Sequence, residues 1–165
     1  MRESEKNEFL HVIMNGKPEA YAEISGSKHY PGIYGNVLFY SVLGGTLILA
    51  DIMGLPTSTG NCMENVFGFH IHEGDDCDGT DEDPFADVGM HYNPQNCKHP
   101  YHAGDLPPLF GNHGIAWMMV FTDRFQPQDV VGRTVIIHDQ PDDFTSQPSG
   151  NSGEKIACGE IESES

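Results

Sequence analysis

The sequence predicts an all-β domain, built as a sandwich or barrel of short strands. Short apolar or alternating runs recur along the chain, and Gly, Pro and Ser residues separate them. No stretch shows an apolar period of about 3.6 residues together with helix caps, so we expect little helix. Many short strands separated by turns are typical of a β-sandwich or a β-barrel.

Eight runs account for the expected strands. In chain order they are AYAEIS (20–25), GNVLFY (35–40), GTLILADI (45–52), VFGFHIH (66–72), LPPLF (106–110), IAWMMVFT (115–122), TVIIH (134–138) and IACGEI (156–161). The first three alternate or are apolar between turn residues, 106–110 is a short strand, and the apolar run 134–138 indicates a buried strand. Two long loops remain, residues 73–104 and 139–155, and loops of that length in a compact domain are usually functional.

Chain length and termini suggest the domain organisation. At 165 residues we expect a single domain over residues 18–165, preceded by a flexible N-terminal extension over residues 1–17. No apolar run reaches about 18 residues, so no membrane span is expected. Residues 1–8 are polar and lack the apolar stretch of a secretory signal. The sequence as it stands favours the cytoplasm, whereas removal of a leader would indicate the periplasm or the cell exterior.

The composition is strongly acidic. Lysine and arginine number 8 against 25 aspartate and glutamate residues, which gives a net charge of −17. This charge argues against nucleic acid and against anionic membranes as partners. Residues 73–87 are rich in Asp and Glu and contain no basic residue. They lack the spacing of an EF-hand calcium loop, so we expect a solvated acidic loop.

Two histidines in the run 66–72 point to a metal site. His70 and His72 are two positions apart, and side chains at i and i+2 project from the same face of a strand. Both imidazoles can therefore converge on one ion while Phe69 and Ile71 enter the core. One strand would thus carry half of a metal site.

A second group of candidate ligands lies further along the chain. It comprises His91, His99, His102 and Asp105, in a segment rich in Pro, Asn and Gly that can wrap around an ion. Three imidazoles and one carboxylate form the four-coordinate set that zinc prefers. His138 ends the buried run 134–138 and would add a third imidazole to His70 and His72. Imidazole-rich sites suit copper.

The order and spacing of these residues resemble the copper/zinc superoxide dismutase family. That family's motifs are an HxH strand, a loop with HxNP and HxGDLP, and a later histidine followed four residues on by aspartate. The match extends from about Phe67 to Cys158 and Gly159. The resemblance implies a flattened eight-stranded Greek-key barrel, an immunoglobulin-like sandwich with two long functional loops. It also implies copper ligands His70, His72, His91 and His138, and zinc ligands His91, His99, His102 and Asp105.

The same resemblance implies roles for residues outside the ligand sets. Asp142, four residues after His138, would hydrogen-bond one copper histidine and one zinc histidine. The catalytic residues would be His91, which exchanges a proton, and Lys155, which stands where the family has an anion-guiding arginine. Lysine keeps the positive charge but lacks the planar fork of the guanidinium group. Guidance of an anion is therefore expected to be weaker than in the rest of the family.

The four cysteines fall into two groups. Cys77 and Cys158 occupy the positions of the family's disulfide, and the five-residue step from His72 to Cys77 is similar to bacterial members. Cys62 and Cys97 have no counterpart in the family pattern, and both a second disulfide and two free thiols are open. A reducing cytoplasm argues against both bridges, although this family can keep the first.

The function implied is dismutation of superoxide to oxygen and hydrogen peroxide, at a copper site that a histidine bridges to a structural zinc. The alternative is a dismutase-like protein that buffers or stores copper and zinc with weak or no turnover. The net charge and Lys155 favour this alternative, because an acidic surface repels superoxide. A zinc-only scaffold is a third reading. The family dimerises through different faces in different branches, so a homodimer is compatible with the sequence but its interface is open.

Overall fold

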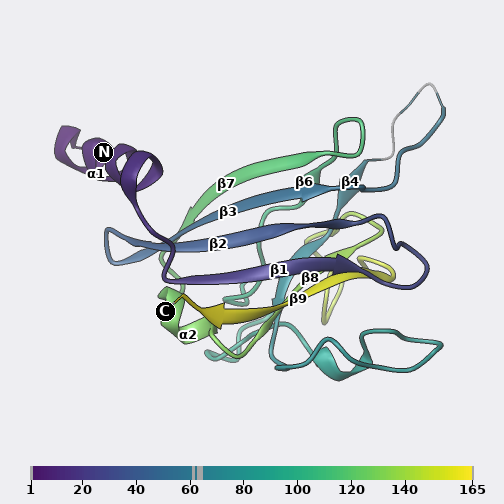
Figure 1. Ribbon diagram of the computed structural model, residues 1–165. Coiled ribbons are helices and arrows are strands. Elements are labelled where there is room, and N and C mark those ends of the chain that lie inside the picture. Colours follow the sequence, from purple (N-terminus) through teal and green to yellow (C-terminus); the bar gives the residue numbers. More distant parts are fainter. Residues whose placement is uncertain (1, 61, 63–64, 165) are drawn as a thin grey trace.

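A computed structural model describes residues 2–60, 62 and 65–164 (Figure 1). The strands are β1 (Ala20–Gly26), β2 (Tyr34–Val42), β3 (Gly45–Met53), β4 (Val66–Phe67), β5 (Phe69–His72), β6 (Leu109–Phe110), β7 (Ala116–Thr122), β8 (Thr134–His138) and β9 (Lys155–Ser163). Three helical segments accompany them: α1 (Glu3–Asn15), the 3₁₀ turn η1 (Ala86–Val88) and α2 (Pro127–Val130). The expectation of a mostly β protein with little helix is confirmed.

The strands form one curled antiparallel sheet and one small one. The seven-stranded sheet has the order β5-β8-β9-β1-β2-β3-β7, and β4 pairs with β6. Strands β1, β2 and β3 form a meander, whereas the neighbours β3 and β7, β5 and β8, and β1 and β9 are distant in sequence. Figure 1 shows how these strands curl into a partial barrel. This architecture is consistent with the Greek-key barrel expected from the resemblance.

Alternating burial builds the core. In β1, Ala20, Ala22 and Ile24 are buried, while Tyr21 and Glu23 point away from the core, as the two-residue period of a strand requires. Strands β5 and β8 differ because every residue in them is buried. Polar side chains carried by these two strands are therefore shielded from water.

The run expected as one strand at 66–72 is two strands that belong to different sheets. The chain changes sheet at Gly68, whose N–H donates to the Gln140 carbonyl at 2.8 Å and whose carbonyl accepts from the His138 N–H at 2.8 Å. A Cβ atom at Gly68 would lie 2.9 Å from the Ser152 Cβ, so a larger residue would push the 139–155 loop away. The split gives nine strands in the described part of the chain, in place of the eight expected, and it sets β5 directly beside β8.

The N-terminal segment, expected to be a flexible extension, is helical in the structure. Helix α1 projects from one end of the sheet (Figure 1), and none of its residues is buried. Glu5 accepts a hydrogen bond from the Arg2 N–H at 2.8 Å and so caps the first turn. The ring of Phe9 packs edge-on against Phe121 of β7, with 5.2 Å between centroids. The sequence has no clear apolar face here, which is why this helix was not predicted. Its flexibility and the domain boundary at residue 17 stay predictions.

The described residues contain no helix that is both long enough and apolar enough to cross a membrane.

The acidic loop is tied to the barrel by a disulfide. Cys77 and Cys158 are bonded with an S–S distance of 2.02 Å, which confirms the expected pair. Cys158 lies in β9, so the bond attaches the loop after β5 to the sheet. Cys62 and Cys97 are exposed free thiols. Of the two alternatives for this second pair, the structure therefore has the thiols.

The disulfide is expected to stabilise the fold through the unfolded chain. It joins residues 81 positions apart, and restricting so long a loop is worth about 2–4 kcal/mol in free energy of unfolding. We expect Cys158→Ser to lower the stability of the metal-free protein by that amount in urea denaturation, and Cys97→Ser to leave it unchanged. An unfolding midpoint that ignores the loss of Cys158 would contradict this prediction.

Candidate metal centre

The candidate ligands come from two buried strands and from a loop that pairs with one of them. His70 and His72 lie on β5, which forms an edge of the large sheet, and His138 ends the adjacent strand β8. The loop runs along the free side of β5. The Tyr92 N–H donates to the Ile71 carbonyl at 2.8 Å, and the Ile71 N–H donates to the Gly104 carbonyl at 2.9 Å. Backbone bridges set His91 opposite His72 and Asp105 opposite His70. The strand edge thus aligns both parts of the site.

The first cluster consists of four imidazoles. Ligand atoms of His70, His72, His91 and His138 all lie within 4.8 Å of one another, and all four residues are buried. The rings of His70 and His91 stack with 3.9 Å between centroids. An all-imidazole set of this kind suits copper.

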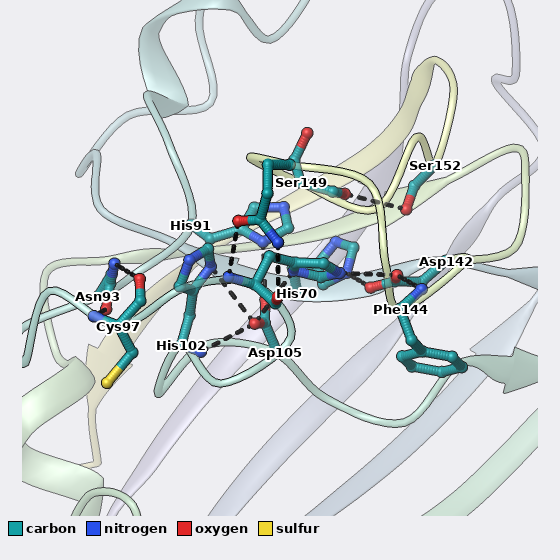
Figure 2. Close-up of polar contacts among 12 residues, drawn as sticks. His70, His91, Asn93, Cys97, His102, Asp105, Asp142, Phe144, Ser149 and Ser152 are labelled. Carbon is teal, nitrogen blue, oxygen red and sulfur yellow. Dashed lines mark hydrogen bonds and ion pairs between the residues drawn. The ribbon is translucent and has the colours of Figure 1, made fainter.

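The second cluster contains three imidazoles and a carboxylate. Its members His91, His99, His102 and Asp105 also have ligand atoms within 4.8 Å of one another. The Nδ1 atoms of His91, His99 and His102 lie 2.7, 3.1 and 3.3 Å from Asp105 oxygens. Figure 2 shows Asp105 beside His91 and His102. The set has the composition of a tetrahedral zinc site, and His91 belongs to both clusters.

Orphaned nitrogens show that these residues fit metal ions. The buried atoms without a hydrogen-bond partner include His70 Nδ1, His72 Nε2, His91 Nε2, His99 Nδ1, His102 Nδ1 and both ring nitrogens of His138. A buried polar atom without a partner is costly, so such atoms are rare. Here they converge within two clusters of the kind that a metal ion would satisfy. The residues present therefore fit both copper and zinc.

Burial favours the neutral form of four of these imidazoles, those of His70, His72, His102 and His138. It lowers the pKa of His138 to about 3, and it lowers the pKa of His72 well below the usual value. Burial also lowers the pKa of His70 and of His102, against the opposing effect of nearby carboxylates. A neutral imidazole offers a lone pair to a metal, whereas an imidazolium does not. The barrel wall therefore holds these ligands ready at neutral pH.

Asp142 connects the two clusters through hydrogen bonds to one histidine of each. It accepts a hydrogen bond from His70 Nε2 at 2.7 Å (Figure 2) and another from His99 Nε2 at 2.9 Å. Burial would raise the pKa of Asp142, but these bonds and one from the Phe144 N–H outweigh it and lower the pKa. With the Nε2 protons fixed in this way, the Nδ1 lone pairs of both rings point into the clusters.

Gly150 makes room for this carboxylate. Its φ is +75°, and a Cβ atom there would lie 2.0 Å from Asp142 Oδ1 and 2.7 Å from His99 Nε2. Only glycine takes this backbone conformation at no steric cost. The turn within the 139–155 loop therefore depends on Gly150 to let the loop close on the histidines.

Three further residues orient the ligands, and sequence reasoning missed them all. The carbonyl of Gly89 accepts from His72 Nδ1 at 2.9 Å, which leaves Nε2 free to bind. Gln147 pairs with the backbone of His99, donating to its carbonyl at 2.7 Å and accepting from its N–H at 3.1 Å. Arg124 donates to the carbonyls of His102 and Asp105 at 2.9 and 3.2 Å. None of these contacts has a sequence signal, because each involves a backbone carbonyl or N–H.

Lys155 and Cys97 lie at the margin of the centre. Lys155 begins β9 opposite His138, where the pairing of β8 and β9 is irregular, and its Nζ donates to Asp83 Oδ2 at 2.8 Å. The acidic partner was not foreseen from the sequence. Cys97 is exposed and its backbone bonds to the Asn93 side chain (Figure 2). It belongs to neither cluster.

Comparison with known proteins places this geometry in a family. The family model described as "Copper/zinc superoxide dismutase (SODC)" matches residues 33–161. "Superoxide dismutase [Cu-Zn]" of Legionella pneumophila is 34% identical over 143 residues, which cover 79% of this chain and 79% of the relative. The protein of that name from Deinococcus radiodurans is 32% identical over 133 residues, or 70% of this chain and 69% of the relative.

A third relative covers more of the chain at lower identity. "Superoxide dismutase [Cu-Zn] 2" of Aquifex aeolicus is 29% identical over 158 residues, which cover 87% of this chain and 86% of the relative. All three relatives are bacterial, as the position of Cys77 suggested. Since the family match runs from the turn before β2 into β9 and includes every residue of both clusters, this chain belongs to the copper/zinc superoxide dismutase family.

Proposed function

We propose that this chain catalyses the dismutation of superoxide to oxygen and hydrogen peroxide, with copper in the four-histidine cluster and zinc in the cluster of three histidines and Asp105. The observation that carries the proposal is the position of His91, whose ring belongs to both clusters. Family membership supports the reaction and both metals. The assignment of individual ligands is our own proposal.

The chain's residues have distinct tasks in this reaction. Bound copper would supply the one-electron redox chemistry that superoxide dismutation requires. His91 Nδ1 faces Asp105 on the zinc side, so a proton taken up by this ring resides at Nε2. Nε2 lies inside the copper cluster and has no protein partner, so it can pass that proton to the peroxide that forms. Burial of both clusters excludes competing water.

Metal buffering is the second candidate function. The net charge of −17 and the pairing of Lys155 with Asp83 favour it, since both weaken the approach of an anion. The complete four-histidine cluster favours the enzyme, because loss of a copper ligand would be the clearest mark of a protein that no longer catalyses the reaction. Elemental analysis of the purified protein, followed by a dismutation assay after copper loading, separates the two. Full loading without fast turnover would support buffering.

Location and assembly stay predictions. For location, the cytoplasm and the periplasm or cell exterior are the two alternatives, and superoxide is the small-molecule partner that family membership implies. The acidic composition argues against nucleic acid and anionic membranes as partners. A homodimer is compatible with the family. Cell fractionation and analytical ultracentrifugation measure these properties directly.

The ligand assignment predicts different losses from two histidine substitutions. His138→Ala should remove copper and spare zinc, because His138 belongs only to the first cluster. His91→Ala should weaken both metals, because His91 belongs to both. Elemental analysis after dialysis against a weak chelator measures both outcomes. Normal copper content in the His138 variant would refute the assignment.

Asp142 is expected to support both metals without binding either. In Asp142→Asn the amide nitrogen faces a ring N–H, so one of the two histidine contacts is lost. Losing such an outer contact typically weakens metal affinity by about 10- to 100-fold. Asp143→Asn is the matched control, since Asp143 bonds only within the turn, to residues such as Ser146. Equal metal affinity in both variants, from competition with a chelator, would contradict this role.

Lys155 is expected to guide the anion. We predict that Lys155→Met slows the reaction roughly 10-fold, the low end of the effect of steering charges, with metal content unchanged. Lys155→Arg should raise the rate, because a guanidinium offers two parallel donors to a small anion. Added salt should slow the wild-type protein if this local charge outweighs the net negative charge. Stopped-flow rates that ignore both substitutions would exclude a guidance role.

A further inference from the structure

Two lysines bind the acidic loop, and the two ion pairs differ in burial. Lys155 pairs with Asp83 at 2.8 Å, and the two side chains are 19% and 47% exposed. Lys28 pairs with Asp81, and there the side chains are 48% and 92% exposed. Water and salt screen an exposed pair strongly, whereas a partly buried pair keeps more of its interaction. The pair at Lys155 is therefore the stronger electrostatic contact.

Asp83 is fixed in place by the loop around it. Its N–H donates to Thr80 Oγ1 at 3.0 Å, and its Oδ1 accepts from the Phe85 N–H at 3.3 Å. Phe85 is buried against the barrel in a small cluster with Val88, Ile136 and Cys158. Asp83 thus lies between two anchors, the disulfide at Cys77 on one side and the Phe85 side chain on the other. These contacts orient the carboxylate toward Lys155, with which it pairs at 2.8 Å.

The position of the pair matters because Lys155 borders the copper cluster. Lys155 is the β9 partner of His138 across the β8–β9 pairing. A positive charge near this cluster favours the approach of a small anion. A carboxylate 2.8 Å from the ammonium cancels much of that field and occupies one of its three donors. An incoming anion therefore competes with Asp83 for Lys155.

We propose that Asp83 is a positioning residue that masks Lys155 and so limits how strongly the copper cluster attracts superoxide and other small anions. The inference deepens the proposed function and depends on it for the identity of the substrate. Removing the carboxylate unmasks the lysine, whereas removing the lysine leaves the carboxylate to repel the substrate.

The kinetic test compares two substitutions in the same loop. Asp83→Asn keeps an oxygen that can accept from Lys155 but removes the charge, and should raise kcat/KM by roughly 3-fold at low ionic strength, with steeper inhibition by salt. Asp81→Asn changes the net charge equally and releases Lys28, so it is the matched control and should have a much smaller effect. In a Lys155→Met background, the gain from Asp83→Asn should fall to the level of Asp81→Asn.

Two readouts do not depend on turnover. Azide titration of the copper-loaded protein, followed by visible absorption, should show a roughly 3-fold lower Kd in Asp83→Asn, in line with the gain in rate. Brief acetylation of the metal-free protein, read by mass spectrometry, should modify Lys155 faster in Asp83→Asn and Lys28 faster in Asp81→Asn. The proposal would be overturned if Asp83→Asn did not raise kcat/KM, or if Asp81→Asn raised it equally. It would also be overturned if the increase from Asp83→Asn persisted in the Lys155→Met background. A copper-loaded wild-type protein that lacks dismutase activity but gives the expected azide and acetylation results would refute the proposed function alone.

Discussion

The imidazole of His91 lies in both clusters, with Nδ1 2.7 Å from Asp105 and Nε2 buried without a protein partner. An apolar barrel tolerates so many unpaired polar nitrogens only where something else satisfies them. The strands and the loop around His91 place these unpaired nitrogens where a metal ion can satisfy them. Strands β5 and β8 are buried at every position, which favours the neutral form of His70, His72 and His138. The loop that carries His91 pairs along the free edge of β5. The same strands and the same loop therefore determine both metal binding and the fold of this edge of the sheet.

The two long loops contact this centre from outside the barrel. The 139–155 loop contributes Asp142, which holds one histidine of each cluster, and Gln147, which holds the backbone of His99. The acidic loop is attached by the disulfide and by Phe85, and it presents Asp83 to Lys155. One loop therefore fixes ligand orientation, while the other sets the charge that an approaching anion meets. The charge that attracts an anion is therefore local to Lys155, and both Asp83 and the net charge of −17 oppose it.

Much of this could be predicted from the sequence because the decisive signals are local. The spacing of His70 and His72 follows from the two-residue period of a strand, and seven of the nine strands in the described residues correspond to separate expected runs. The other two, β4 and β5, divide one expected run at Gly68, where the change of sheet depends on contacts with the 139–155 loop. Helix α1 was missed because none of its residues is buried, so its sequence carries no core-facing pattern.

What the sequence could not reveal are contacts between distant segments through the backbone or through surface charges. Arg124 reaches the carbonyls of His102 and Asp105, and Asp83 reaches Lys155, yet neither pair shares a motif or a spacing. The central claim is that His91 is shared between two metals. A crystal structure of the protein loaded with copper and zinc, with anomalous data collected at both absorption edges, tests it most directly. The account predicts copper at His91 Nε2 and zinc at His91 Nδ1. Two metals with His91 bound to only one of them, or a single metal in the loaded protein, would contradict it.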